Sequence, residues 1–226
     1  MVKFKNNEMN ISFELHKLFN NPKLPFYGFE DLYKVKCTNG IYIFFEKGEI
    51  YKNLKRIVRI GTNRTQGRFY KRLKDHYVAN NKDGSIFRKN IGIAILNKRN
   101  DPYLKVWDKD TSNKQKFKKE NPTLLNDEYQ KEIEAEVSNY IINNVFFTYL
   151  EVENREIRLL LERKLIASIW RDIDFKPSDN WLGMYSTKNS IRECGLWLVQ
   201  GLKSEPFTQD EFEKFYEYVA KHYNLK

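Results

Sequence analysis

The feature that most constrains this chain is a pair of short runs rich in β-branched and aromatic residues, Gly40–Glu46 and Ile57–Gly61. Such runs are typical of strands. The tetrapeptide Glu46-Lys47-Gly48-Glu49 lies between them and has the composition of a turn, so the two strands are predicted to pair as antiparallel neighbours. Side chains alternate along a strand, so Tyr42 and Phe44 are expected on the face opposite Ile41, Ile43 and Phe45. By the same alternation, Tyr42 and Arg59 can share one face of this sheet.

The remaining chain combines helical periodicity with one more strand-like run. Phe69, Leu73 and Tyr77 repeat every four residues, as on the buried face of a helix, and Ser85 has the character of an N-cap for the next helix. The predicted fold class is α+β, with a small antiparallel sheet of about three strands flanked by helices. We expect helices over residues 9–20, 65–79, 86–96, 126–143 and 155–170, another after a capping box at 208–211, and a third strand over 145–152.

Composition excludes several classes of protein. Of the 226 residues, 41% are apolar and 15% are aromatic, which is enough for a buried core. The longest apolar runs, such as Ile41–Phe45, are too short to span a bilayer, and residues 1–8 lack the apolar segment of a secretory signal. The two cysteines, Cys37 and Cys194, form no CxxC pair, which argues against a disulfide scaffold or a structural zinc site. We therefore expect a cytoplasmic protein without a membrane partner.

Positive charge is concentrated in one part of the chain. Residues 52–105 contain 15 Lys or Arg and three Asp, a net charge of +12, whereas the rest of the chain contains 25 basic and 27 acidic residues. A local excess of this kind is typical of a surface that binds a polyanion. The alternative interpretation is a solvated, Lys-rich surface without a binding role.

Three residues with useful chemistry lie where burial is expected. Arg72 and His76 stand four residues apart and so share one face of their predicted helix, although His76 could equally be a histidine that borders the core. Glu162 falls on the flank of the apolar face of its helix, where a carboxylate is costly unless it is paired or holds a cation. Its partner could be Arg158 or Arg163, or a metal, and a lone carboxylate suits Mg²⁺, which keeps most of its waters.

Taken together, these residues resemble the signatures of the GIY-YIG nuclease superfamily, in the order and spacing of that family. The resemblance covers residues 38–183, with an insertion at about 80–143, and leaves residues 1–37 as an N-terminal extension and 184–226 as a C-terminal extension with an amphipathic helix. The matching elements are Gly40-Ile41-Tyr42, Arg59-Ile60-Gly61 with arginine where tyrosine is usual, Lys71-Arg72-Leu73 followed by His76, the Glu-x-x-Leu-Ile pattern within Leu161–Ile166, and Asn180 as the family's late asparagine.

The resemblance implies a metal-dependent endonuclease that hydrolyses phosphodiester bonds of DNA, with Mg²⁺ or Mn²⁺ held by Glu162. Tyr42 would orient or deprotonate the attacking water, and Arg72 would neutralise charge on the phosphate. His76 would carry a proton or contact the phosphate, and Asn180 would position the Glu162 site or the substrate. The catalytic set implied is Tyr42, Arg59, Arg72, His76, Glu162 and Asn180.

Two other functions stay open at this point. The arginine at position 59 favours a nucleic-acid-binding module that kept the fold but is catalytically weak or inactive. Cleavage of RNA is the second, because a basic surface binds either polymer. The residues expected to contact nucleic acid are Arg64, Arg68, Lys71, Lys74, Lys82, Arg88 and Lys89.

Overall fold

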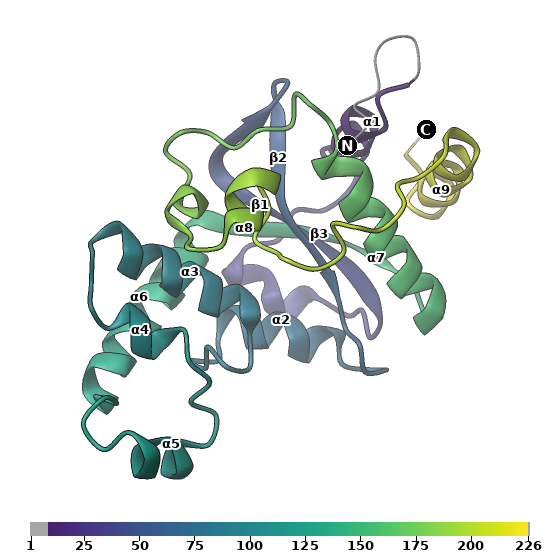
Figure 1. Ribbon diagram of the computed structural model, residues 1–226. Coiled ribbons are helices and arrows are strands. Elements are labelled where there is room, and N and C mark those ends of the chain that lie inside the picture. The colour runs from purple at the N-terminus through teal and green to yellow at the C-terminus, as the bar shows by residue number, and fades with distance from the viewer. Residues whose placement is uncertain (1–8, 226) are drawn as a thin grey trace.

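The structure, a computed structural model, describes residues 9–225. It contains a three-stranded antiparallel sheet in the order β2–β1–β3 (Figure 1), formed by β1 (Gly40–Tyr51), β2 (Leu54–Thr62) and β3 (Val145–Glu151). The predicted α+β class and the antiparallel pairing of the first two strands are therefore confirmed. The predicted lack of a secretory signal concerned residues 1–8, which lie outside the described residues.

The turn between β1 and β2 differs from the prediction. β1 continues through Glu46-Lys47-Gly48-Glu49 as far as Tyr51, with irregular pairing after Phe45. The reversal occurs instead at Lys52 and Asn53, whose φ angles are +47° and +65°. Two consecutive residues with positive φ match the right-handed twist of paired strands, which is why this conformation is favoured in two-residue hairpins.

Helices cover both faces of the sheet (Figure 1). Ile41, Ile43 and Phe45 pack with helices on one side, and Tyr42 and Phe44 pack with helices on the other, so the predicted alternation is confirmed. The first side carries α1 (Ile11–Phe19), α7 (Arg155–Trp170) and α9 (Gln209–His222); the second carries α2 (Phe69–Tyr77), α3 (Ile86–Lys98) and α6 (Asp127–Asn144).

Most predicted helices agree with the structure within a few residues. The clearest difference is α2, which begins at Phe69 rather than at residue 65 because residues 63–68 form a loop with Gly67 at positive φ. Sequence periodicity did not indicate the short elements, which contain too few turns to repeat. They are α4 (Leu104–Trp107), α5 (Lys114–Glu120), α8 (Asn189–Cys194) and the 3₁₀ helices η1 (Phe29–Lys34) and η2 (Leu182–Tyr185).

Segments predicted as an insertion and a C-terminal extension contribute to the central core. Helix α3 lies within the predicted insertion, yet its residues Phe87 and Ile91 are fully buried in the same cluster as Tyr42. In the predicted C-terminal extension, the backbone N–H of Trp197 donates to the carbonyl of Val58 at 2.7 Å and so covers the outer edge of β2. Covering an edge strand in this way satisfies its unpaired backbone groups.

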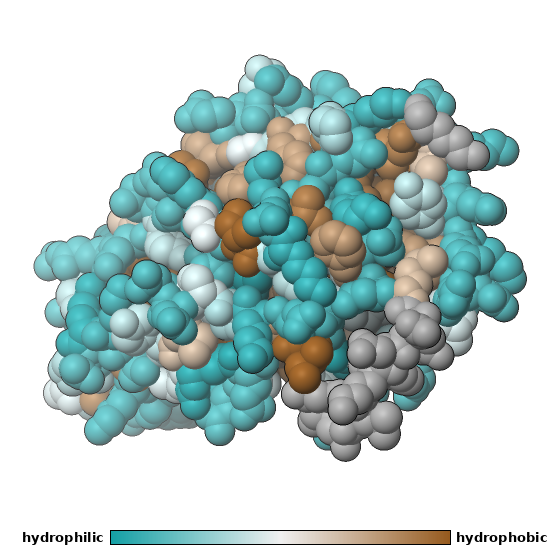
Figure 2. All heavy atoms as spheres, turned by 90° about the horizontal axis from the view of Figure 1, so that it is seen from above, coloured by the Kyte–Doolittle hydropathy of each residue, from teal (hydrophilic) through white to brown (hydrophobic). Residues whose placement is uncertain are grey.

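The surface is mainly hydrophilic on the face seen in Figure 2, where hydrophobic side chains are interspersed among polar ones. Within residues 9–225, no helix has both the length and the apolar character needed to cross a bilayer.

Candidate active site

A cleft of about 880 Å³ opens beside the β1–β2 hairpin, with α2 on one wall and α7 on another. The segment 198–201 completes its lining. The cleft brings together Tyr42, Arg59, Arg72 and Glu162, which lie up to 120 positions apart in the sequence. Its lining is strongly basic, with Arg59, Arg64, Arg68, Lys71, Arg72, Arg155 and Arg163 against Asp75 and Glu162.

Tyr42 reaches the cleft because its neighbour across the hairpin has no side chain. Tyr42 pairs with Gly61 on β2, and a Cβ atom at Gly61 would lie only 2.2 Å from the Tyr42 hydroxyl oxygen. The glycine of the second signature therefore makes room for the tyrosine of the first. The phenol ring is 1% exposed, and its Oη lies 2.8 Å from Nε2 of His76.

His76 lies behind Tyr42 and does not line the cleft. It is fully buried, and its second ring nitrogen, Nδ1, lies 2.8 Å from Oγ of Ser85. Burial lowers the pKa of His76 well below 6.5, and the charges of Arg72, Arg59 and Arg88 lower it further, so the imidazole is neutral at pH 7. Of the two roles expected for His76, direct contact with a phosphate is excluded by this position, and an effect through Tyr42 is favoured.

Arg59 takes part in the site from the same sheet face as Tyr42. It lies opposite Phe44, one pair along from Tyr42 and Gly61. Its Nη1 donates to the carbonyl of Trp197, its guanidinium lies over the ring of Phe87 at 5.2 Å, and the side chain is 6% exposed. Among the described residues, its Nε has no hydrogen-bond partner. A buried donor without a partner is costly, so this N–H is available to an acceptor that enters the cleft.

Glu162 projects from α7 into the same cleft. Burial raises the pKa of its carboxyl, and the positive charges of Arg59, Arg64 and Arg72 oppose that shift. Within residues 9–225, no Lys or Arg lies close enough to form an ion pair with this carboxylate. Arg158, one of the partners considered for it, instead donates to the backbone carbonyl of Val152 at 2.8 Å and is fully buried.

The residues present fit one hard divalent cation. A carboxylate that is partly buried and lacks an ion pair is stabilised by a nearby cation. Among the described residues, no group of three or more His, Cys, Asp and Glu side chains is placed to bind a metal. Of the two carboxylates described in the cleft lining, Asp75 pairs with Lys71 at 2.9 Å, and Glu162 is the one without an ion pair. Mg²⁺ is commonly held by one or two carboxylates and retains several waters, whereas a structural zinc site needs four protein ligands.

Asn180 does not join this site. It lines a separate cavity of about 950 Å³, together with Glu46 and Tyr140. The indole N–H groups of Trp181 and Trp197 donate to Glu46, which is buried. The loop that contains Asn180 is therefore anchored away from Glu162, and the expected role of Asn180 in positioning Glu162 is not supported.

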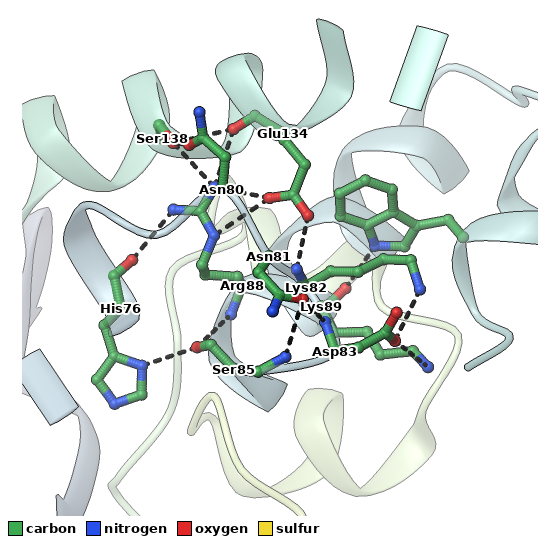
Figure 3. Close-up of polar contacts among 12 residues, drawn as sticks. His76, Asn80, Asn81, Lys82, Asp83, Ser85, Arg88, Lys89, Glu134 and Ser138 are labelled. Carbon is green, nitrogen blue, oxygen red and sulfur yellow. Dashed lines mark hydrogen bonds and ion pairs between the residues drawn. The ribbon is translucent and has the colours of Figure 1, made fainter. Parts of the chain in front are cut away.

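Two residues expected to bind nucleic acid are inside the protein, and Figure 3 shows their polar contacts. Arg88 is fully buried and its Nη2 contacts Glu134 on α6 at 2.8 Å, while Lys82 is 1% exposed and its Nζ contacts Asp83 at 2.8 Å. The structure corrects the prediction for both, because a buried and paired cation cannot reach a polyanion. Lys89 is also largely covered, with Nζ donating to the carbonyl of Lys109 at 3.2 Å.

The other predicted binding residues are accessible. Arg64, Arg68 and Lys71 are exposed and line the cleft, and Lys74 is exposed on α2 outside it. Sequence reasoning missed Arg155 and Arg163 of α7, which line the cleft beside Glu162. Their spacing in the sequence could have indicated this, because positions 155, 159, 162, 163 and 166 lie on one face of a helix and so place both arginines beside Glu162.

Comparison with protein families agrees with this arrangement. A family model described as the GIY-YIG domain matches residues 28–224, which extends beyond both limits of the resemblance seen in the sequence. Searches of curated proteins and of solved structures found no match. A family match that covers most of the chain shows that the chain belongs to the GIY-YIG domain family, and four of the signature residues, Tyr42, Arg59, Arg72 and Glu162, lie together in one basic cleft.

Proposed function

We propose that this protein is an endonuclease that hydrolyses phosphodiester bonds of DNA in the cleft between α2 and α7, with Mg²⁺ or Mn²⁺ as cofactor. The observation that supports it most is the position of Glu162, a carboxylate without an ion pair among the described residues, in a cleft that also holds Tyr42 and seven basic side chains. The family membership supports a nuclease-type function in general.

Each side chain has a role in this proposal that follows from its position. In its phenolate form, after the phenolic proton has passed to solvent in the cleft, Tyr42 orients the attacking water and accepts its proton. Arg72 is half-buried, with Nη1 donating to the carbonyl of Gly84 at 3.2 Å, and it presents its remaining N–H groups to the phosphate oxygens. The free Nε–H of Arg59 donates to the same phosphate. His76 positions Tyr42 and touches no substrate.

Glu162 would hold the cation, which when bound supplies Lewis acidity at the phosphate and at the leaving oxygen. The surrounding arginines would neutralise the phosphodiester backbone and so draw the substrate toward Glu162. In such a basic site the Glu162 carboxylate would repel a phosphate by itself, so holding a positive ion between the two is the role that suits it.

A cleavage assay tests the proposal directly. Supercoiled plasmid, linear duplex DNA and a duplex RNA of the same sequence are incubated with the protein in Mg²⁺, in Mn²⁺ and in EDTA. We expect cleavage of DNA only when a divalent cation is present. Cleavage of RNA alone would establish the other polymer as substrate, and DNA binding without cleavage in either metal would identify a binding module.

The exposed arginines of the cleft should determine the salt dependence of binding. Charge reversal at Arg68 and Arg163, which lie on opposite walls, should weaken DNA binding and lower the slope of log affinity against log salt by roughly one unit for each lost phosphate contact. Fluorescence anisotropy from 50 to about 200 mM salt measures the slope. Lys214→Glu on α9, outside the cleft, is the control, and an equal loss in that variant would place binding elsewhere.

Gly61 should be indispensable to the position of Tyr42. In Gly61→Ala, the new methyl group would occupy the space of the Tyr42 hydroxyl, so the ring must move and its hydrogen bond to His76 is lost. We expect cleavage to fall on the order of 10²-fold with a stability loss of about 1–3 kcal/mol, measured by initial rates and by denaturant unfolding. Gly28→Ala, where a Cβ meets no atom within 4 Å, should change neither, and normal cleavage in Gly61→Ala would contradict the role of the hairpin.

A further inference from the structure

A chain of buried hydrogen bonds leads from the cleft to the start of α3. Oη of Tyr42 lies 2.8 Å from Nε2 of His76, and Nδ1 of the same ring lies 2.8 Å from Oγ of Ser85. The backbone N–H of Arg88 donates to Ser85 Oγ at 3.3 Å, since Ser85 is the N-cap of α3. Figure 3 shows the contacts of Ser85 with the His76 ring and with the Arg88 backbone.

Neighbouring residues fix the positions of His76 and Ser85 through further hydrogen bonds and an ion pair. Arg88 donates to the backbone carbonyl of His76 at 3.2 Å and pairs with Glu134, and Glu134 in turn accepts from the backbone N–H of Lys82 at 2.6 Å. These contacts join α2, α3 and α6 on both sides of Ser85 (Figure 3). Ser85 is 1% exposed, so its hydroxyl hydrogen must find its acceptor within the protein.

The number of hydrogens available determines which group donates in each hydrogen bond between Ser85, His76 and Tyr42. The oxygen of Ser85 already accepts a hydrogen bond from the Arg88 backbone, and among the described residues its only other hydrogen-bonding neighbour is His76. If Nδ1 of His76 carried a hydrogen, the Ser85 hydroxyl would have no acceptor, and an unsatisfied buried donor costs about 1–3 kcal/mol. The Ser85 hydroxyl therefore donates to Nδ1, and the single hydrogen of the neutral ring is on Nε2.

We propose that Ser85 is a positioning residue that fixes the Nε2–H form of His76 and thereby makes His76 a hydrogen-bond donor to the oxygen of Tyr42. In this arrangement His76 cannot accept the phenolic proton of Tyr42. The hydroxyl hydrogen of Tyr42 is left free to point toward the cleft, where it can pass to solvent. The His76 N–H then stabilises the negative charge left on the phenol oxygen. The consequence for cleavage rests on the proposed nuclease function, whereas the form of His76 does not.

Three substitutions at Ser85 separate this role from capping. Asp and Asn are both good N-caps, so both keep α3 capped. An Asp carboxylate can only accept, which forces the hydrogen of His76 onto Nδ1, whereas an Asn amide can accept from the Arg88 backbone and donate to Nδ1. Ser85→Thr keeps the hydroxyl itself. Thermal unfolding of each variant confirms that it is folded.

The primary measurement is the protonation form of His76 by ¹⁵N NMR of the full chain. We expect hydrogen on Nε2 in the parent, Ser85→Thr and Ser85→Asn, and hydrogen on Nδ1 in Ser85→Asp. In the cleavage assay, Thr and Asn should keep kcat within about tenfold of the parent, and Asp should lower it about 10²-fold or more. Any parent spectrum with hydrogen on Nδ1 would overturn the proposal, as would full cleavage by folded Ser85→Asp. If the parent cleaves nothing while the NMR result is as expected, the nuclease function fails and the assignment of His76 stands.

Discussion

Replacing Glu162 with Gln is expected to abolish DNA cleavage while leaving DNA binding and the fold intact. The amide keeps the shape of the side chain, but among the described residues the cleft loses its one carboxylate without an ion pair, which is the ligand that we propose for the divalent cation. The activation free energy of phosphodiester hydrolysis is expected to rise by several kcal/mol, which corresponds to a rate loss on the order of 10³-fold. Initial rates of plasmid cleavage over a Mg²⁺ titration measure this loss.

The matched control is Glu156→Gln, an exposed glutamate on the same helix and outside the cleft, which should cleave at the parent rate. Isothermal titration with Mn²⁺ gives a second readout: the parent should bind and Glu162→Gln should not. Parent-like cleavage by Glu162→Gln would show that the carboxylate is not the metal ligand.

The same substitution should have a characteristic effect on stability. Because burial raises the pKa of Glu162 above 4.5, the ionised carboxylate is less favourable in the folded chain than in the unfolded chain. The free energy of unfolding therefore falls as pH rises from 4.5 through the raised pKa, and the cost is fully present above it. Without metal at pH 7, Glu162→Gln should have a Tm equal to or higher than that of the parent, and this difference should vanish below pH 4.5. A markedly lower Tm at pH 7 would indicate a structural role.

Removing the hydroxyl of Tyr42 is the second change with a large expected effect. In Tyr42→Phe the ring still packs against Phe44 and Phe69, but the hydroxyl that we propose as the group that orients the attacking water and takes its proton is gone. We expect kcat to fall about 10²- to 10⁴-fold, with DNA affinity unchanged. The buried His76 loses its partner at Nε2, which should lower the free energy of unfolding by about 1–3 kcal/mol.

Tyr77→Phe controls for that loss of stability. Tyr77 is equally buried on the same side of the sheet, and its hydroxyl donates to the carbonyl of Val145 at 3.1 Å, but it does not line the cleft. Both variants should lose comparable stability, measured by urea unfolding, and only Tyr42→Phe should lose cleavage. Unimpaired turnover by Tyr42→Phe would remove tyrosine from the mechanism.

The sequence predicted well wherever a local pattern carried the information. Alternation along β1 assigned Tyr42 and Ile43 to opposite faces, and residues 155–170 matched α7, which Asn154 caps by accepting from two backbone N–H groups. Local patterns suffice here because buried positions recur at a regular spacing along a strand or an amphipathic helix. The hairpin turn was misplaced because Gly48 is a strong turn residue, whereas the actual turn uses Lys52 and Asn53, of which only Asn53 is a usual turn residue.

Which charges reach the surface was decided by the tertiary structure. Arg68 and Arg88 both belong to the basic stretch, and nothing in the local sequence distinguishes them. Arg68 is exposed in the cleft, whereas Arg88 is fully buried against Glu134, 46 positions away. Sequence gives the total charge of a segment but not its partners, because an ion pair between distant elements forms only when the helices that carry them pack together. The positive surface is therefore smaller than the net charge of residues 52–105 suggests.

The sequence by itself determined the three strands, the longer helices and most of the residue types gathered in the cleft, because signature residues keep a fixed order on elements that local patterns define. Only the tertiary structure decided how those residues are arranged. It placed His76 behind Tyr42, left Glu162 without an ion pair among residues 9–225, kept Asn180 apart, and brought Ser85 to the far side of the His76 ring. Hydrogen-bond direction and burial depend on atoms from elements distant in the chain, so no local pattern can encode them.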